Sequence, residues 1–113
     1  LPQNIILVAE EDGEILGYQC TYVSFDEGEL TNIAVKRTAR GQGVGQHLIR
    51  KLQEKAVESG VERIVLEARV TNDTAIALYE KMGFINLGIR KNLYEHPVED
   101  GVIMSYTAEE NKC

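Results

Sequence analysis

Three glycines at alternate positions, Gly41, Gly43 and Gly45, are the residues whose spacing most clearly serves chemistry. They lie in the segment from Arg40 to Gln46, between a short apolar run and a helical pattern. Glycine allows positive φ and leaves no Cβ to block a ligand. The first turn of a helix leaves about four N–H groups unpaired, at the positive end of the helix dipole. Such a segment predicts an anion site, most often for a phosphate or diphosphate, although it can also serve only as a turn.

The elements on either side of this loop follow from hydrophobic periodicity. Before the loop, the apolar run 33–35 ends a predicted strand over residues 29–35. After it, apolar residues recur at every fourth position, namely Val44, Leu48, Leu52 and Ala56. This period predicts a helix over residues 44–59 with one buried stripe. A strand, a glycine-rich turn and a helix therefore follow one another.

The rest of the chain alternates between strand-like and helix-like segments. Further strands are expected at residues 4–10, 16–22, 61–70, 84–94 and 102–106, and a second helix at residues 73–82. Either Asn72 or Asp73 is expected to cap that helix. Turns are predicted at residues 12–13, 26–28 and 95–101. Tyr18 and Tyr22 share one face of the second strand and are interpreted as core or as groove lining.

This order predicts a single α/β domain over residues 1–108 with a mixed sheet, followed by a tail at residues 109–113. The elements run strand–strand–strand–helix–strand–helix–strand–strand. The third and fourth strands should be parallel, because a helical crossover joins them, and this crossover should be right-handed. Since strand-like sequence begins almost at Leu1, we expect that a preceding segment is missing.

Composition excludes several classes of protein. The net charge of −6 argues against direct binding of nucleic acid, which normally requires a basic face. No apolar run approaches the roughly 18 residues of a membrane helix, and no signal peptide is visible. Cys20 and Cys113 are expected to be free thiols in a reducing compartment. His47 and His96 stand alone, so no metal site is predicted.

Several motifs in a fixed order give the chain a recognisable resemblance. They are Asn32-Ile33-Ala34-Val35, Arg40-x-x-Gly43-x-Gly45, Leu66-Glu67, Asn72-x-x-Ala75-x-x-Leu78-Tyr79-x-x-x-Gly83-Phe84, Arg90-Lys91-Asn92-x-Tyr94 and Glu99-Asp100-x-x-x-Met104. This set resembles the GCN5-related N-acetyltransferase (GNAT) superfamily, and within it the RimI-type N-terminal alanine acetyltransferases. The glycine loop alone is weakly specific, whereas the ordered set is strongly so. The resemblance covers nearly the whole chain.

The resemblance implies the GNAT fold without its first strand and first two helices, and acetyl-CoA as co-substrate. By resemblance, the glycine loop would hold the diphosphate, the strand before it would lie beside the pantetheine arm, and Asn72 would also contact the cofactor. The implied cofactor-binding residues are Ile33, Ala34, Val35, Arg40, Gly41, Gln42, Gly43, Val44, Gly45, Gln46 and Asn72.

By the same resemblance, Glu67 is the expected general base and Tyr79 the general acid. An amine attacks a thioester only when neutral, and at pH 7 deprotonation costs roughly 1–1.4 kcal/mol for an α-amine but roughly 4.6 kcal/mol for a lysine. A carboxylate can accept that proton, and a phenol can protonate the leaving thiolate. Without the resemblance, Glu67 would be interpreted as a solvated strand residue and Tyr79 as helix packing. Tyr94 is a plausible residue of a peptide groove.

The expected function is direct transfer of an acetyl group to the N-terminal α-amine of a ribosomal protein, with alanine favoured as the first residue. The enzyme is expected to act in the cytoplasm as a monomer or weak dimer. The alternatives are acetylation of a small-molecule amine or polyamine, and a non-catalytic CoA-binding module. A dinucleotide site is disfavoured because five residues separate Val35 from Gly41, and a P-loop is excluded because no Gly-Lys-Ser/Thr follows. Arg37 stands where this family often has proline, and Leu93-Tyr94 stands where RimI-type proteins tend to have two tyrosines.

Overall fold

The computed structural model describes residues 3–108, which form six strands, two α-helices and a short 3₁₀ turn. The strands are β1 (Gln3–Glu11), β2 (Glu14–Ser24), β3 (Glu27–Val35), β4 (Arg63–Arg69), β5 (Ile85–Glu95) and β6 (Val98–Thr107). The helices are α1 (Val44–Glu58) and α2 (Asp73–Lys81), and the 3₁₀ turn covers Arg37–Ala39. The predicted order of elements is therefore confirmed. The predicted tail at residues 109–113, with Cys113, lies outside the described residues.

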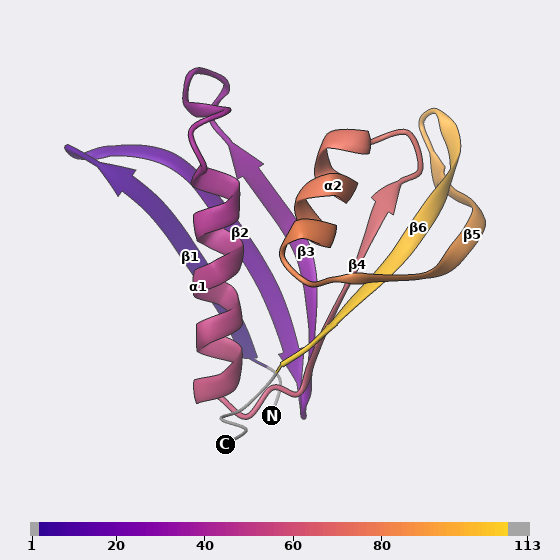
Figure 1. The fold of residues 1–113 in the computed structure, drawn as a ribbon, viewed down its shortest axis with the longest axis horizontal. Helices are drawn as coiled ribbons and strands as arrows, with labels where there is room; N and C mark the ends of the chain where they lie inside the picture. Colours follow the sequence, from indigo (N-terminus) through magenta and orange to yellow (C-terminus); the bar gives the residue numbers. More distant parts are fainter. Residues whose placement is uncertain (1–2, 109–113) are drawn as a thin grey trace.

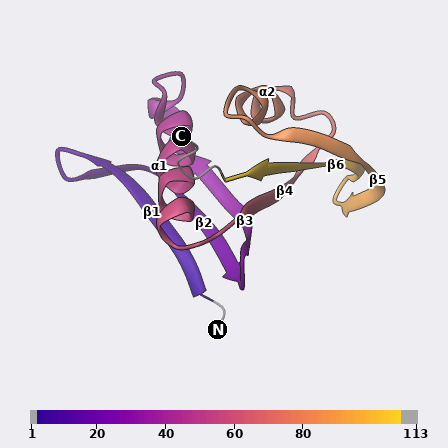
Figure 2. The ribbon, with the colours of Figure 1, turned by 60° about the horizontal axis from the view of Figure 1, so that its bottom comes forward.

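All six strands belong to one mixed sheet with the order β1-β2-β3-β4-β6-β5. Only β3 and β4 run parallel, as the predicted crossover through α1 requires. Figure 1 shows α1 in front of β1 and β2, and α2 between β3 and β4. Figure 2 confirms that both helices cover the same face of the sheet, which leaves the other face open. The core lies between that face and the helices, with Ile49, Leu52 and Met104 fully buried.

The open face corrects one expectation from the sequence. On β2 the residues that point under α1 are Gln19 and Thr21, which are 0% and 1% exposed. Their polar groups are paired inside the core, because Gln19 donates to the Ile5 carbonyl at 2.9 Å and Thr21 donates to Gln19 at 2.6 Å. Tyr18 and Tyr22 point to the other face and are 42% and 45% exposed, so they are not core residues.

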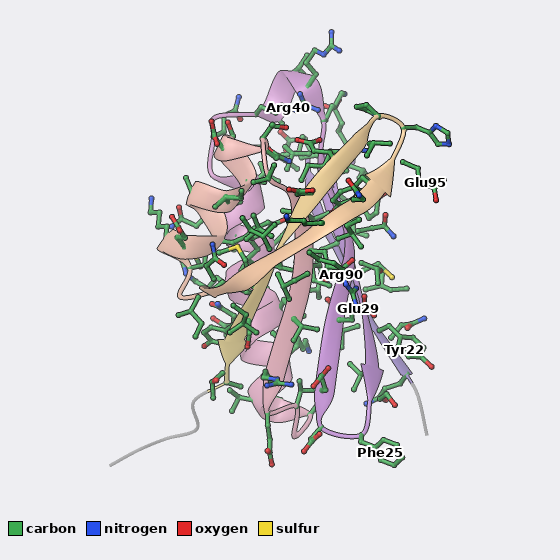
Figure 3. All side chains as sticks on the ribbon, turned by 90° about the vertical axis from the view of Figure 1, so that its right-hand side faces the viewer. Tyr22, Phe25, Glu29, Arg40, Arg90 and Glu95 are labelled. Carbon is green, nitrogen blue, oxygen red and sulfur yellow. The ribbon has the colours of Figure 1, made fainter. Side chains whose placement is uncertain are left out.

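Two predicted turns are shorter or earlier than expected, whereas the Asp12-Gly13 turn is confirmed. The β2–β3 turn consists of Phe25 and Asp26, because Gly28 is already buried inside β3 and pairs with Val23. The predicted loop at residues 95–101 shrinks to two residues, 96 and 97, because residues 98–101 extend β6 and pair with β5 and β4. The turn at Phe25 lies at the end of the sheet opposite to Arg40 (Figure 3).

The parallel strands β3 and β4 stay together only at one end. They pair from Glu27 with Arg63 to Glu29 with Val65, and then they part (Figure 1). Residues 30–35 of β3 pair with β2 alone, and residues 66–69 of β4 pair with β6 alone. A bulge on β3 at Thr31 stands where the strands separate. Since bulges bend a strand and end pairing, this one explains why β3 turns away from β4.

Candidate active site

The glycine loop presents a row of free backbone donors at the start of α1. The first bond that closes the helix runs from the His47 N–H to the Gly43 carbonyl at 2.9 Å. Within residues 3–108, no group accepts a hydrogen bond from the N–H of residues 41–46. Six consecutive unpaired N–H groups at the positive end of a fifteen-residue helix have the geometry that binds an anion in other proteins, and residues 41–46 are called the cradle below.

Two of the three glycines are required by backbone conformation and the third by packing. Gly41 and Gly43 have φ values of 79° and 83°, and a Cβ on either would meet nothing within 4 Å. Their outer side is therefore open to a ligand. Gly45 is inside the helix, where a Cβ would lie 3.2 Å from Leu78 Cδ2 on α2. This glycine lets α1 and α2 approach each other, a role in addition to the predicted one.

The side chains predicted to help the cradle mostly stabilise it. Arg40 donates from Nε to the Val35 carbonyl at 3.2 Å, and Gln42 donates to the Thr38 carbonyl at 3.4 Å. Both contacts tie the loop to the chain that precedes it. Asn72 caps α2, because its Oδ1 accepts from the Ala75 N–H at 3.2 Å. This resolves the choice between Asn72 and Asp73, and the amide nitrogen of Asn72 has no described partner.

The predicted pantetheine strand lies at the parted edge of β3. Ile33 and Val35 are half-buried and Ala34 is exposed. On the β4 side, the backbone of these residues has no strand partner among the described residues. An extended ligand can therefore hydrogen-bond there as an added strand would. This edge leads directly to the cradle, in which Val44 and Gln46 are half-buried.

Glu67 lies on the parted stretch of β4 and points to the open face of the sheet. Its neighbours Leu66 and Ala68 are buried beneath the helices, so alternation along the strand directs Glu67 outward. Arg90 of β5 donates from Nη1 to Glu67 Oε2 at 3.3 Å. Arg90 and Glu67 are 64% and 36% exposed at their side chains, so water and an acceptor can reach the carboxylate. Figure 3 shows Arg90 near the middle of β5, seen from the β5 edge of the sheet.

Tyr79 approaches the site from the helix side. Its ring is 7% exposed and contacts Phe84 at a centroid distance of 5.8 Å. No buried polar side-chain atom among residues 3–108 lacks a partner, and no hydrogen bond of the Tyr79 hydroxyl is present. That hydroxyl must therefore reach solvent. Burial, and to a smaller extent Tyr94, raises the pKa of Tyr79, so the phenol keeps its proton at neutral pH.

Tyr94, near the end of β5, interacts electrostatically with both predicted catalytic residues, and the sequence alone did not establish its place. Partial burial and then the charge of Glu67 raise the pKa of Tyr94, while Arg69 lowers it. Tyr94 also contributes to the raised pKa of Tyr79. It therefore stands within electrostatic reach of both. The motif Arg90-Lys91-Asn92-x-Tyr94 was the available signal, but nothing in it showed that Tyr94 approaches Tyr79.

Residues 3–108 contain neither a metal-binding cluster nor a membrane-spanning helix. No group of three His, Cys, Asp or Glu side chains is arranged to hold a metal ion in this part of the chain. Neither of its two helices has the length and apolar character needed to cross a membrane. Cys20 is a free, half-buried thiol.

With this geometry in view, the sequence was compared with known families and structures. The profile of the acetyltransferase (GNAT) family matches residues 1–84. The chain belongs to the GNAT family. The predictions of family and fold are thus confirmed.

Curated relatives and solved structures agree with this GNAT assignment. A Bacillus subtilis protein provisionally named ribosomal protein bS18-alanine N-acetyltransferase is 42% identical over 109 residues, which is 96% of this chain and 72% of that protein. The Escherichia coli protein of that name is 40% identical over 91 residues, 80% of this chain and 60% of its own length. The chain thus spans about three-fifths to three-quarters of these relatives.

Two crystal structures extend the comparison. The ribosomal-protein-S18-alanine N-acetyltransferase from Escherichia coli aligns with a TM-score of 0.89 and 33% identity over 96% of this chain and 72% of that chain. A GNAT acetyltransferase from Elizabethkingia anophelis with acetyl-CoA bound aligns with a TM-score of 0.83 and 25% identity over 90% of this chain and 74% of that chain. The roles of the individual site residues stay predictions.

Proposed function

We propose that this GNAT domain transfers the acetyl group of acetyl-CoA to the N-terminal α-amine of a protein, with alanine as the first residue and a ribosomal protein as the acceptor. The observation that carries the proposal is the parting of β3 from β4 directly beside the free N–H cradle. One extended ligand with a diphosphate at one end and a reactive group at the other fits this arrangement. The residues that would bind the cofactor and those that would take the proton of the acceptor amine then belong to different parts of the molecule.

The residues of this chain fit acetyl-CoA as a co-substrate. Its thioester supplies an acetyl group that an amine can take up. The N–H groups of residues 41–46 would bind the diphosphate, because they are unpaired and the space outside Gly41 and Gly43 is open. The free edge of β3 at residues 33–35 would pair with the amide-containing arm. The structure of a relative with acetyl-CoA bound supports this choice of ligand.

Glu67 and Tyr79 would move the two protons of the reaction. A Glu67 carboxylate oxygen would accept a proton from the acceptor amine, directly or through water, since it is exposed on the open face. The Tyr79 hydroxyl would donate a proton to the departing sulfur, and its raised pKa keeps that proton in place at neutral pH. Direct attack by the amine needs no nucleophile from the protein.

The acceptor class rests on the relatives and on charge. The two curated relatives carry the name of an enzyme that acetylates the alanine of ribosomal protein bS18. The acidic net charge of −6 favours the approach of a basic acceptor, as ribosomal proteins generally are. We further propose that the protein acts in the cytoplasm, where ribosomal proteins are made, as a monomer or weak dimer.

The decisive experiment compares acceptors in the presence of acetyl-CoA. Peptides that differ only in their first residue are incubated with the complete protein, and mass spectrometry distinguishes α-amine from lysine products. We expect α-amine acetylation with alanine preferred, and no product on a peptide with a blocked N-terminus. Turnover of polyamines without any peptide product would instead assign the protein to small-molecule acetylation.

A further inference from the structure

Glu99, at the start of β6, is the centre of a hydrogen-bonded network that the proposed proton transfers do not use. Its Oε1 accepts from Arg69 Nη1 at 3.0 Å, and its Oε2 accepts from the Thr71 N–H at 3.1 Å and from the Thr71 hydroxyl. These contacts lower the pKa of Glu99, the bond from the Thr71 hydroxyl most, then that from Arg69, and then that from the Thr71 N–H. The carboxylate is thus ionised at neutral pH and bridges the end of β4 to the chain that leads into α2.

Arg69 carries this network to the β5–β6 hairpin. The same guanidinium donates to the Pro97 carbonyl at 3.0 Å and to the His96 carbonyl at 3.3 Å, which are the two residues of the turn. It also lies over the ring of Tyr94, with Cζ 4.4 Å from the centroid. A planar guanidinium can make these contacts at once, whereas an ammonium group cannot.

The backbone around Tyr94 is shaped to bring its ring to this place. The pairing of β5 with β6 is interrupted between Arg90 and Tyr94, and Asn92 inside this bulge has a φ of 54°. Asp100, next to Glu99, accepts from the Asn92 N–H at 2.9 Å and holds the bulge. Gly101 has no side chain there, and a Cβ would lie 2.3 Å from Leu93 Cδ2 and 3.2 Å from Tyr94 Cε2.

We propose that Glu99 is a positioning residue, which through Arg69 holds the Tyr94 ring in place and so shapes the acceptor side of the active site. Through Thr71, the residue before the Asn72 cap, the same carboxylate ties the hairpin to the helix that carries Tyr79. The inference rests on the proposed function for its kinetic consequence. Its structural consequence, the place of Tyr94, is independent of that function.

The test is Glu99→Gln, which keeps the shape of the side chain and removes its charge. We expect kcat/KM for the acceptor peptide to fall about tenfold, because hydrogen bonds to a charged group are lost, while acetyl-CoA affinity changes less than twofold. The NMR signals of the Tyr94 ring in tyrosine-labelled protein, assigned with Tyr94→Phe, should shift without any substrate. This second readout decides the inference even if the wild-type protein transfers no acetyl group.

The matched control is Glu27→Gln. Glu27 makes an ion pair of 2.9 Å with Arg63 across β3 and β4, where the strands still pair. The inference is overturned if Glu99→Gln leaves the Tyr94 signals and kcat/KM unchanged and lowers the melting temperature only as Glu27→Gln does. Glu99 would then be purely structural. If Glu99→Gln does not fold, Arg69→Lys tests the inference by the same measurements, kcat/KM and the Tyr94 signals. Lysine keeps the positive charge of Arg69 but lacks its planar guanidinium.

Discussion

The two halves of the active site are built from different parts of the polypeptide. The half between β3 and α1 consists of backbone, namely the N–H groups of residues 41–46 and the free edge of β3, and its side chains mostly stabilise the loop. The half between β4, α2 and the β5–β6 hairpin consists of side chains, namely Glu67, Tyr79 and Tyr94.

This difference suits the ligands that each half would bind. A cofactor is the same in every turnover, so a rigid arrangement of backbone donors can be matched to it. An acceptor amine must lose a proton during the reaction, and only ionisable side chains can take that proton. Substitutions in the first half should therefore act through backbone conformation, and those in the second half through functional groups. Three substitutions test this contrast.

The largest effect is expected for Glu67→Gln, which removes the proton acceptor and keeps the shape. We expect kcat to fall about 10²- to 10⁴-fold, most strongly at low pH, where the amine is protonated. Acetyl-CoA affinity should stay nearly unchanged. Glu29→Gln is the control, because Glu29 is an exposed glutamate on the adjacent strand, before the strands part. A pH–rate profile of Glu67→Gln equal to that of the wild type would remove Glu67 from its role.

Tyr79→Phe should lower kcat about a hundredfold, because the leaving sulfur loses its proton donor. The melting temperature at pH 7 should hardly change, since the hydroxyl has no described partner. Because burial raises the pKa of Tyr79 above its ordinary value of 10.0, the stability that depends on the protonated phenol is complete below pH 10 and is lost as pH rises through the higher pKa of the folded state. Tyr79→Phe should therefore resist alkaline unfolding better than the wild type, and equal curves would contradict the assignment.

A smaller effect is expected for Gly43→Val. The new side chain faces the cradle and strains a φ of 83°, so acetyl-CoA affinity should fall at least about tenfold, as expected for lost hydrogen bonds to a charged ligand. At saturating cofactor, kcat should change little. Gly60→Val is the matched control, because Gly60 follows the other end of α1 with a φ of 77° and equally open surroundings. It should lower the melting temperature similarly and leave acetyl-CoA affinity intact. Equal affinity losses in both variants would show that strain alone is responsible.

The sequence was informative wherever a feature is local. The glycine spacing, the period of four in α1 and the Asn72 cap each depend on neighbouring residues, and all three agree with the structure. It was misleading for Tyr18 and Tyr22, because alternation on β2 separates two faces without saying which face the helices cover. It also made the β5–β6 loop too long, since residues 98–101 extend a strand only through pairing with two neighbours.

The sequence by itself therefore determined the order of elements, the glycine-rich loop before α1 and the family, because these depend on short-range periodicity and on motifs in a fixed order. Only the tertiary structure decided where β3 leaves β4, that Arg69 lies over the Tyr94 ring, and that Glu99 binds Arg69 and Thr71. These contacts join residues that are far apart in the chain, and their partners depend on strand register and bulges. No local pattern specifies them.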